Sequence, residues 1–218
     1  MDILYEDNHI IVAVKPHMMP TQADSSGHLD MLTALKQYIK EKYQKPGNVY
    51  LGLVHRLDRP AGGVMVFART SKAASRLSQQ VRQGQLGKFY YAAVTGSPPA
   101  SGCLEDYLAK DSSSNTVRVT DASHGKYAKL YYKIVAQQGG LSLADIQLCT
   151  GRPHQIRVQF ASRGCPLYGD ARYGQGKGDH LALFAYRLTF CHPTLRQEMT
   201  FTAAPKDAPL CKLLSIKR

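Results

Sequence analysis

The chain has 218 residues, of which 44% are hydrophobic and 20% charged, and it contains no low-complexity segment, which excludes a disordered or fibrous protein. A chain of this length can bury a core without disulfides or metal ions, so we expect one domain over residues 1–218. The formal net charge of +12 indicates a polyanionic partner, although an ordinary basic surface explains a bare charge count equally well.

The five cysteines are spread along the chain without a C-x-x-C pair or a zinc-finger spacing, which favours free thiols in a reducing compartment. The N-terminus lacks the basic and apolar segments of a signal peptide, and no stretch reaches the about 20 apolar residues of a membrane span. We therefore expect a cytoplasmic protein without membrane contact and without a metal site. We also expect a monomer.

The first 95 residues alternate short apolar runs with two amphipathic patterns. Apolar residues at helical spacing predict a helix between Leu29 and Lys45, and another that begins at Ser71 and closes at Gly84 or Gly87. Runs rich in β-branched residues predict strands at 3–5, 9–14, 50–54, 63–68 and 89–94. The third and fourth of these strands flank a polar loop, residues 55–62.

The second half begins with a polar, serine-rich segment at 111–121, which predicts a surface hairpin of unassigned role. Strands are predicted at 127–135 and 141–148, joined by a turn that contains two glycines, and a last strand at 181–188. Strands and helices do not alternate regularly as βαβ units would. The sequence therefore predicts an α+β fold with a mixed, largely antiparallel sheet and a few helices.

One further helix is predicted from Pro153 to about Arg163. Proline suits the first helical position, because its missing N–H would be unpaired there in any case, and Gly164 supplies the stop. On such a helix His154 and Arg157 lie three positions apart and share one face.

Asp58 stands out on electrostatic grounds, because two arginines flank it in the polar loop. Arg56 and Arg59 favour its ionised form, and an ionised carboxylate can act as a nucleophile or a base. On the local sequence alone, an acid that caps a turn is the commoner explanation.

A longer block around Asp58 resembles the central motif of the RluA-type pseudouridine synthases, in which the aspartate is the catalytic nucleophile. The block reads Leu53-Val54-His55-Arg56-Leu57-Asp58-Arg59-Pro60-Ala61-Gly62-Gly63-Val64. The resemblance continues in the family's order over nearly the whole chain, in Lys15-Pro16, Lys88-Phe89-Tyr90-Tyr91-Ala92, Thr150-Gly151-Arg152-Pro153-His154-Gln155-Ile156-Arg157 and Pro166-Leu167-Tyr168-Gly169-Asp170. Two departures affect local backbone and hydrogen bonding: Ala61-Gly62 replaces a small hydroxyl pair, and Gln159 stands where the family usually has His.

The resemblance implies a pseudouridine synthase catalytic domain over residues 1–218, without a separate N-terminal RNA-binding appendage. It implies an isomerase that converts uridine to pseudouridine in folded ribosomal RNA, transfer RNA or both, after the base is flipped out of the stack. Such an enzyme needs neither a metal ion nor an organic cofactor. The sequence separates neither these RNAs nor direct attack on the sugar from a glycal-type intermediate.

The resemblance also assigns two catalytic residues outside the loop. Tyr90 matches the tyrosine that stacks on the flipped uracil and helps to remove the C5 proton. Arg157 matches the basic residue that pairs with the catalytic aspartate, so we expect an ion pair between Asp58 and Arg157.

Basic residues near these motifs are predicted to contact RNA. Arg56 resembles the arginine that enters the space left by the extruded base, and Arg152 and His154 lie near a helix start, where phosphate binds readily. His55 is expected to brace the loop rather than react. The predicted RNA-binding residues are Arg56, Arg59, Lys15, Lys88, Arg152 and His154.

Two other functions fit parts of the sequence. One is a non-catalytic RNA-binding protein on the same fold, in which Asp58 is a structural acid. The other is a metal-independent ribonuclease that uses His55, His154 and a lysine. The ribonuclease hypothesis leaves Asp58 and Tyr90 without a role.

Overall fold

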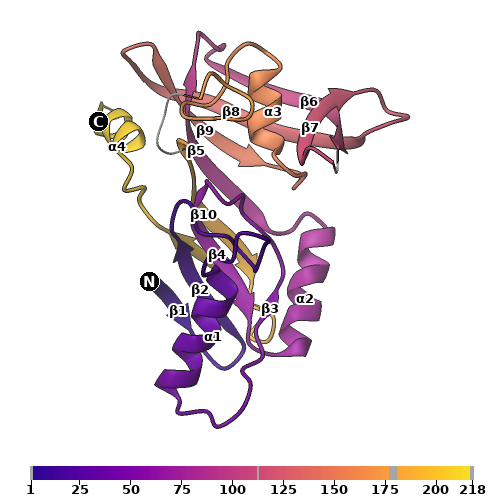
Figure 1. Ribbon diagram of the computed structural model, residues 1–218, viewed down its shortest axis with the longest axis vertical. Coiled ribbons are helices and arrows are strands. Elements are labelled where there is room, and N and C mark those ends of the chain that lie inside the picture. Colours follow the sequence, from indigo (N-terminus) through magenta and orange to yellow (C-terminus); the bar gives the residue numbers. More distant parts are fainter. Residues whose placement is uncertain (1, 112, 177–180, 217–218) are drawn as a thin grey trace. The chain divides into compact units, whose positions relative to one another are not determined.

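The computed structural model describes residues 2–111, 113–176 and 181–216 (Figure 1). The chain forms two compact units, each assembled from two separate segments. The first unit combines Met1–Leu86 with Arg187–Ala203, and the second combines Gly87–Tyr186 with Ala204–Arg218. The expectation that residues 1–218 act as one catalytic domain stays a prediction.

The first unit is built on antiparallel strands. β2 (Ile10–Lys15) pairs with β1 (Asp2–Glu6) on one side and with β4 (Gly62–Ala68) on the other, and β3 (Gly52–Leu53) also pairs with β4. All seven residues of β4 are buried, which explains why its sequence is a continuous apolar run rather than an alternating one.

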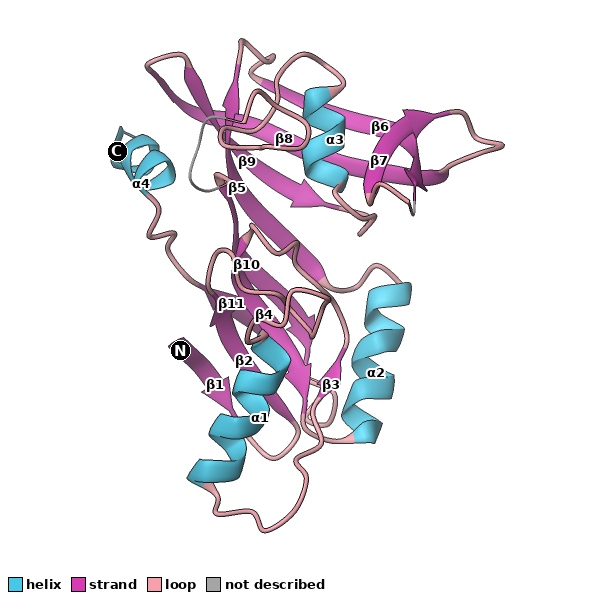
Figure 2. Ribbon diagram, viewed as in Figure 1, coloured by secondary structure: helices cyan, strands magenta, loops and turns pink. Residues whose placement is uncertain are grey.

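Two helices belong to the first unit, as the sequence predicted. α1 (Met31–Lys42) begins after Asp30, whose carboxylate accepts hydrogen bonds from the backbone N of Thr33 at 3.0 Å and from its hydroxyl at 2.7 Å. α2 (Ser71–Arg82) begins after Thr70 in the same way, and Figure 2 shows it alongside β3 and β4. Its apolar side, Ala73 and Leu77, joins the core of the unit.

The second unit is an antiparallel sheet in the strand order β5-β9-β8-β6-β7. Along β8 buried and exposed residues alternate, so one face of this sheet is apolar. The short helix α3 (Gln155–Ala161) packs on this face, where Phe160 meets Tyr132 edge-on at 5.1 Å (Figure 2). The strands are β5 (Gly87–Thr95), β6 (Ser101–Asp111), β7 (Thr116–Thr120), β8 (Lys126–Gln138) and β9 (Leu141–Leu148).

Strand β10 (Leu183–Cys191) crosses from the second unit into the first, and its last residues pair with β11 (Glu198–Thr202). The chain then returns to the second unit and ends in α4 (Ala208–Ile216), which packs against β5, β8 and β9. The predicted α+β fold, with a mixed, largely antiparallel sheet and a few helices, is confirmed. The strands β6 and β11 and the helix α4 were not predicted.

The start of α3 was predicted wrongly. The helix begins at Gln155, not at Pro153, because His154 adopts a left-handed backbone with φ of 51° and ψ of 19°. His154 and Arg157 therefore do not share a helix face. No helix among the described residues is long and apolar enough to cross a membrane.

Candidate active site

Asp58 lies in the loop between β3 and β4 of the first unit and is partly exposed. Its carbonyl accepts a hydrogen bond from the backbone N of Ala61 at 3.0 Å, which closes a tight turn over Arg59 and Pro60. Leu57, the residue before it, is buried and anchors this turn to the core. The loop thus presents the Asp58 carboxylate from a short, fixed turn.

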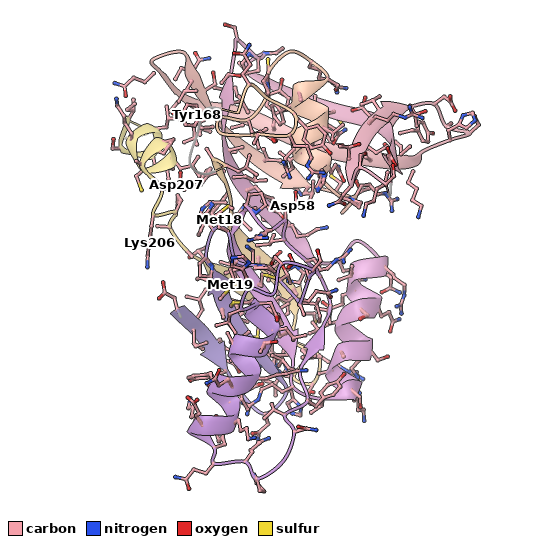
Figure 3. All side chains as sticks on the ribbon, in the orientation of Figure 1. Met18, Met19, Asp58, Tyr168, Lys206 and Asp207 are labelled. Atoms are coloured by element: carbon pink, nitrogen blue, oxygen red, sulfur yellow. The ribbon has the colours of Figure 1, made fainter. Side chains whose placement is uncertain are left out.

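The segment that follows β2 holds this loop by hydrogen bonds to its backbone. The hydroxyl of Thr21 donates to the carbonyl of Leu57 at 2.8 Å and accepts from its backbone N at 3.3 Å. The ring Nδ1 of His17 lies 2.8 Å from the carbonyl of Pro60. Figure 3 shows Asp58 at the same end of the first unit as Met18 and Met19, which belong to this segment. Because these contacts bracket Asp58 in the sequence, they restrict where its carboxylate can lie.

Lys15 also supports the loop, through hydrogen bonds from its side chain. Its ammonium is fully buried and donates to three carbonyls, those of Pro16 at 3.0 Å, Met19 at 2.6 Å and Arg59 at 3.1 Å. The expectation that Lys15 contacts RNA stays a prediction, although its ammonium already donates to three carbonyls within the protein.

The charge of Lys15 also bears on Asp58. Burial lowers the pKa of Lys15 to about 7, the negative charge of Asp58 opposes this, and the positive charge of Arg59 adds to it. The positive charge of a protonated Lys15 and the negative charge of Asp58 attract each other.

The other basic residues of the loop differ in exposure. The Nε2 of His55 accepts a hydrogen bond from the backbone N of Val66 at 3.1 Å, which ties the loop to β4 as expected. Arg56 is exposed. Arg59 is partly exposed, and its Nε donates to the carbonyl of Met18 at 3.3 Å. Arg56 is thus the loop cation most open to a ligand.

Tyr90 lies in the second unit, on β5, and is 6% exposed. Its neighbour Tyr91 points to the opposite face, where its ring stacks on Tyr186 at 3.9 Å. The hydroxyl of Tyr186 donates to Asp145 at 3.0 Å. The stack on one face and the pairing of β5 with β9 fix the direction in which Tyr90 points.

Arg157 lies on α3, also in the second unit, and is 5% exposed. Its guanidinium forms a two-point ion pair with Asp170, from Nε to Oδ2 at 2.8 Å and from Nη2 to Oδ1 at 2.8 Å. The ring of Tyr173 lies 5.1 Å from the same guanidinium. Asp170 belongs to a block that resembles the family, Pro166-Leu167-Tyr168-Gly169-Asp170, but it was not among the predicted site residues. The expected ion pair between Asp58 and Arg157 would join residues of different units and stays a prediction.

Three further predicted RNA-binding residues lie in the second unit. Arg152 donates from Nε to the carbonyl of Tyr127 at 2.8 Å, which holds the guanidinium near the sheet. Burial lowers the pKa of Lys88, and the positive charge of Arg152 lowers it further, while Cys149 opposes the change. The ring Nδ1 of His154 lies 2.7 Å from the hydroxyl of Tyr173. Two neighbouring cations, Lys88 and Arg152, are an arrangement that an anion would stabilise.

Gln159 occupies the position where the family usually has His, and it is fully buried. It accepts from the amide of Gln155 at 3.1 Å and donates to Asp106 at 2.7 Å. Arg163 binds the same carboxylate at 2.9 Å. These contacts connect α3 to β6. Gln159 makes them as a neutral amide, whereas the histidine usual in the family would bring a titrating ring.

Comparison with known proteins decides the family. The model of the RNA pseudouridylate synthase family matches residues 9–162. The chain belongs to this family. The enzyme is therefore an RNA pseudouridine synthase, an isomerase that converts uridine to pseudouridine in RNA.

Relatives support the assignment over nearly the whole chain. The ribosomal large subunit pseudouridine synthase D of Zymomonas mobilis is 32% identical over 99% of this chain and 73% of its own length. The uncharacterized RNA pseudouridine synthase YhcT of Bacillus subtilis is 34% identical over 98% of this chain and 71% of its own. The structure of human RNA pseudouridylate synthase domain containing 4 has the same fold, with a TM-score of 0.79, 23% identity and coverage of 94% and 89% of the two chains.

Among the described residues there is no group of three or more His, Cys, Asp or Glu side chains that could hold a metal ion. The five cysteines form no disulfide.

Proposed function

We propose that Asp58 is the nucleophile of this synthase and that it acts on a uridine flipped out of folded RNA. The reaction breaks the bond between N1 of uracil and C1′ of the ribose and forms a bond from C5 to C1′, with no net oxidation. An ionised carboxylate can attack C1′ directly or remove a ribose proton to give a glycal-type intermediate. Both routes need the anion, and neither needs a metal ion or an organic cofactor.

Tyr90 and Arg157 have the other two catalytic roles in this proposal. The Tyr90 ring stacks on the detached uracil, and its phenol assists in removing the C5 proton. The Arg157 guanidinium pairs with Asp58.

The RNA is held by the basic residues outside the catalytic set. Arg56 fills the space of the extruded base, and Arg59, Lys88, Arg152 and His154 contact the RNA backbone. Extrusion costs a few kcal/mol of stacking energy, which these contacts offset. The relative from Zymomonas mobilis is named for the large ribosomal subunit, so we propose ribosomal RNA as substrate, with transfer RNA as the second substrate class. We place a monomeric enzyme in the cytoplasm, where its five thiols stay reduced.

The observation that carries the proposal is the support of the Asp58 loop. Lys15, His17 and Thr21 make hydrogen bonds to the loop backbone on both sides of Asp58. These bonds fix the backbone that carries the Asp58 side chain, and Asp58 itself is partly exposed. A fixed backbone and partial exposure suit a carboxylate that must meet a substrate.

The test is the variant Asp58→Asn, which keeps the size of the side chain and removes its charge. We expect pseudouridine formation to fall below detection, by at least about 10⁴-fold, because a neutral amide can neither attack C1′ nor remove a proton. RNA affinity should stay within severalfold. Pseudouridine is measured by chemical labelling and primer extension on RNA from a strain that lacks the gene.

Glu41→Gln is the matched control. Glu41 is an exposed acid on α1 of the same unit, and the change to an amide has the same effect on net charge. Its activity should equal that of the wild type. Measurable turnover by Asp58→Asn would contradict the nucleophile assignment and favour a structural acid.

A further inference from the structure

We infer that Asp170 is a positioning residue, which holds the Arg157 guanidinium in the orientation needed to engage the catalytic carboxylate. The inference rests on the proposed pairing of Arg157 with Asp58. Asp170 would not touch RNA or the reacting atoms, since its side chain is fully buried. It acts through Arg157 alone.

The contact between the two residues fixes the guanidinium in a plane. Two parallel hydrogen bonds of 2.8 Å each join Nε and Nη2 of Arg157 to the two oxygens of Asp170. A two-point pair of this kind leaves a guanidinium little freedom to rotate, whereas a single bond would let it swing. The side chains are 6% and 0% exposed, so water does not compete for these bonds.

Asp170 is itself held by the backbone that follows it. Its Oδ1 accepts hydrogen bonds from the backbone N of Arg172 at 2.9 Å and of Tyr173 at 3.1 Å. Burial raises the pKa of Asp170, but the bonds and charge of Arg157, together with these two N–H groups, outweigh burial and lower it overall. The carboxylate is therefore ionised at neutral pH.

The ring of Tyr173 limits the movement of the Arg157 guanidinium out of its plane. Its ring lies 5.1 Å from Cζ of Arg157, within the range of a cation–π contact. The hydroxyl of Tyr173 is fixed in turn, because it accepts from the backbone N of Val117 at 2.8 Å and lies 2.7 Å from Nδ1 of His154. Arg157 is thus held in its plane by Asp170 and on its face by Tyr173.

Stability alone explains this arrangement poorly. A buried ion pair is weak evidence for stability, because the cost of removing two charges from water offsets most of their attraction. A rigid guanidinium next to a reactive carboxylate, in contrast, lowers the reorganisation needed during the reaction. Small displacements of a catalytic group can cost about 10²-fold in rate.

The test is a double-variant cycle on the single-turnover rate constant, with enzyme in excess over RNA. Asp170→Asn should lower this rate constant at least tenfold and leave the dissociation constant of the RNA within about threefold. In an Arg157→Ala background the same change should add less than about twofold, because Asp170 then has nothing to position.

The matched control is Asp106→Asn. Asp106 pairs with Arg163, just beyond the end of the same helix, at 2.9 Å and close to the surface. It should stay within about twofold of the wild-type rate. An equal loss from Asp170→Asn in both backgrounds, or no loss at all, would overturn the inference in favour of a purely structural role.

Tyr173 provides a second test should Asp170→Asn fail to fold. Tyr173→Phe keeps the ring over Arg157 and loses the hydroxyl, whereas Tyr173→Leu loses both. The Leu variant should react at least threefold more slowly than the Phe variant at equal RNA affinity. Equal rates would overturn the positioning by the ring. An unaltered rate for Arg157→Ala would contradict the proposed role of Arg157 itself, a result that no Asp170 variant can mimic.

Discussion

Two buried cations in this enzyme are stabilised in different ways. Lys15 is surrounded by three carbonyl oxygens and no directly bonded carboxylate among its described contacts, whereas Arg157 has a carboxylate in a two-point pair. Carbonyl dipoles compensate a buried charge less fully than an opposite charge does. Lys15 therefore holds its proton weakly, with a pKa of about 7, and titrates in the physiological range.

Replacing Lys15 by Met should change how stability depends on pH. The folded pKa of about 7 lies below the value near 10.5 of an exposed lysine, so the unfolded chain binds more protons between these pH values. Lys15 thus destabilises the folded state most at and below pH 7, and this cost is relieved as the pH rises toward 10. The stability of the wild type relative to Lys15→Met should rise from pH 6.5 to pH 9.5, measured as urea midpoints.

Lys40→Met, at an exposed position on α1, is the control. Its urea midpoint should depend on pH in the same way as that of the wild type. If the midpoint of Lys15→Met also follows the wild type at every pH, the lowered pKa of Lys15 is contradicted.

At the scale of helices and strands, most elements with local determining contacts were predicted. Asp30 and Thr70 each cap a helix from the position before it, and both helices were predicted. The strand β11 and the helix α4 had local signals that were missed. Met199 and Phe201 alternate with polar residues, and Asp207 accepts from the backbone N of Leu210 at 3.1 Å.

Other elements depend on contacts that no local pattern reveals. β6 carries Asp106 on the side of the sheet that faces α3, where a charged residue argues against a strand. That carboxylate is compensated by Gln159 and Arg163, more than 50 positions later in the sequence. The left-handed His154, which delays the start of α3, is likewise bound to a residue beyond the helix.

The candidate site shows the same difference between features set by local sequence and features set by distant contacts. The family motif identified Asp58, and the pairing of β3 with β4 places its loop as predicted. The burial of Lys15 could not be predicted, because one of its acceptors, the carbonyl of Arg59, lies 44 positions away. The role of Asp170 depends on a bond to Arg157 that only the folded second unit reveals.

The cap of α1 supports a prediction on stability. Asp30 is 3% exposed and accepts from both the backbone N and the hydroxyl of Thr33. Asp30→Ala should lower the free energy of unfolding by about 1–2 kcal/mol, because two donors at the start of the helix lose their acceptor. The measurement is the urea midpoint followed by far-ultraviolet circular dichroism. Asp24→Ala, at an exposed turn, serves as the control, and a shift as large as that of Asp30→Ala would contradict the role of the cap.

For the whole molecule, the net charge of +12 favours binding of the RNA substrate, because RNA is a polyanion. Each phosphate that a lysine or arginine neutralises releases bound counterions, so affinity falls with salt by about 0.7 to 0.9 log units per log unit of salt for each contact. The slope therefore counts phosphate contacts, whereas a base contact changes affinity without changing the slope. This difference separates the proposed backbone contacts from the residues that we propose act on a flipped uridine.

We expect the dissociation constant of the RNA to rise steeply between about 50 and 200 mM salt. Arg152→Gln should weaken binding at every salt concentration and reduce the slope by about 1, since it removes one phosphate contact. Asp58→Asn should leave the slope within about 0.3 of the wild-type value, because the proposed role of Asp58 is at the ribose and not at a phosphate. Lys40→Gln is the charge-matched control, because it removes one exposed positive charge outside the predicted RNA-binding residues and should leave the slope unchanged. Equal changes in slope for Arg152→Gln and Lys40→Gln would indicate that the protein attracts RNA only by its net charge. A flat profile for the wild type would contradict backbone docking altogether.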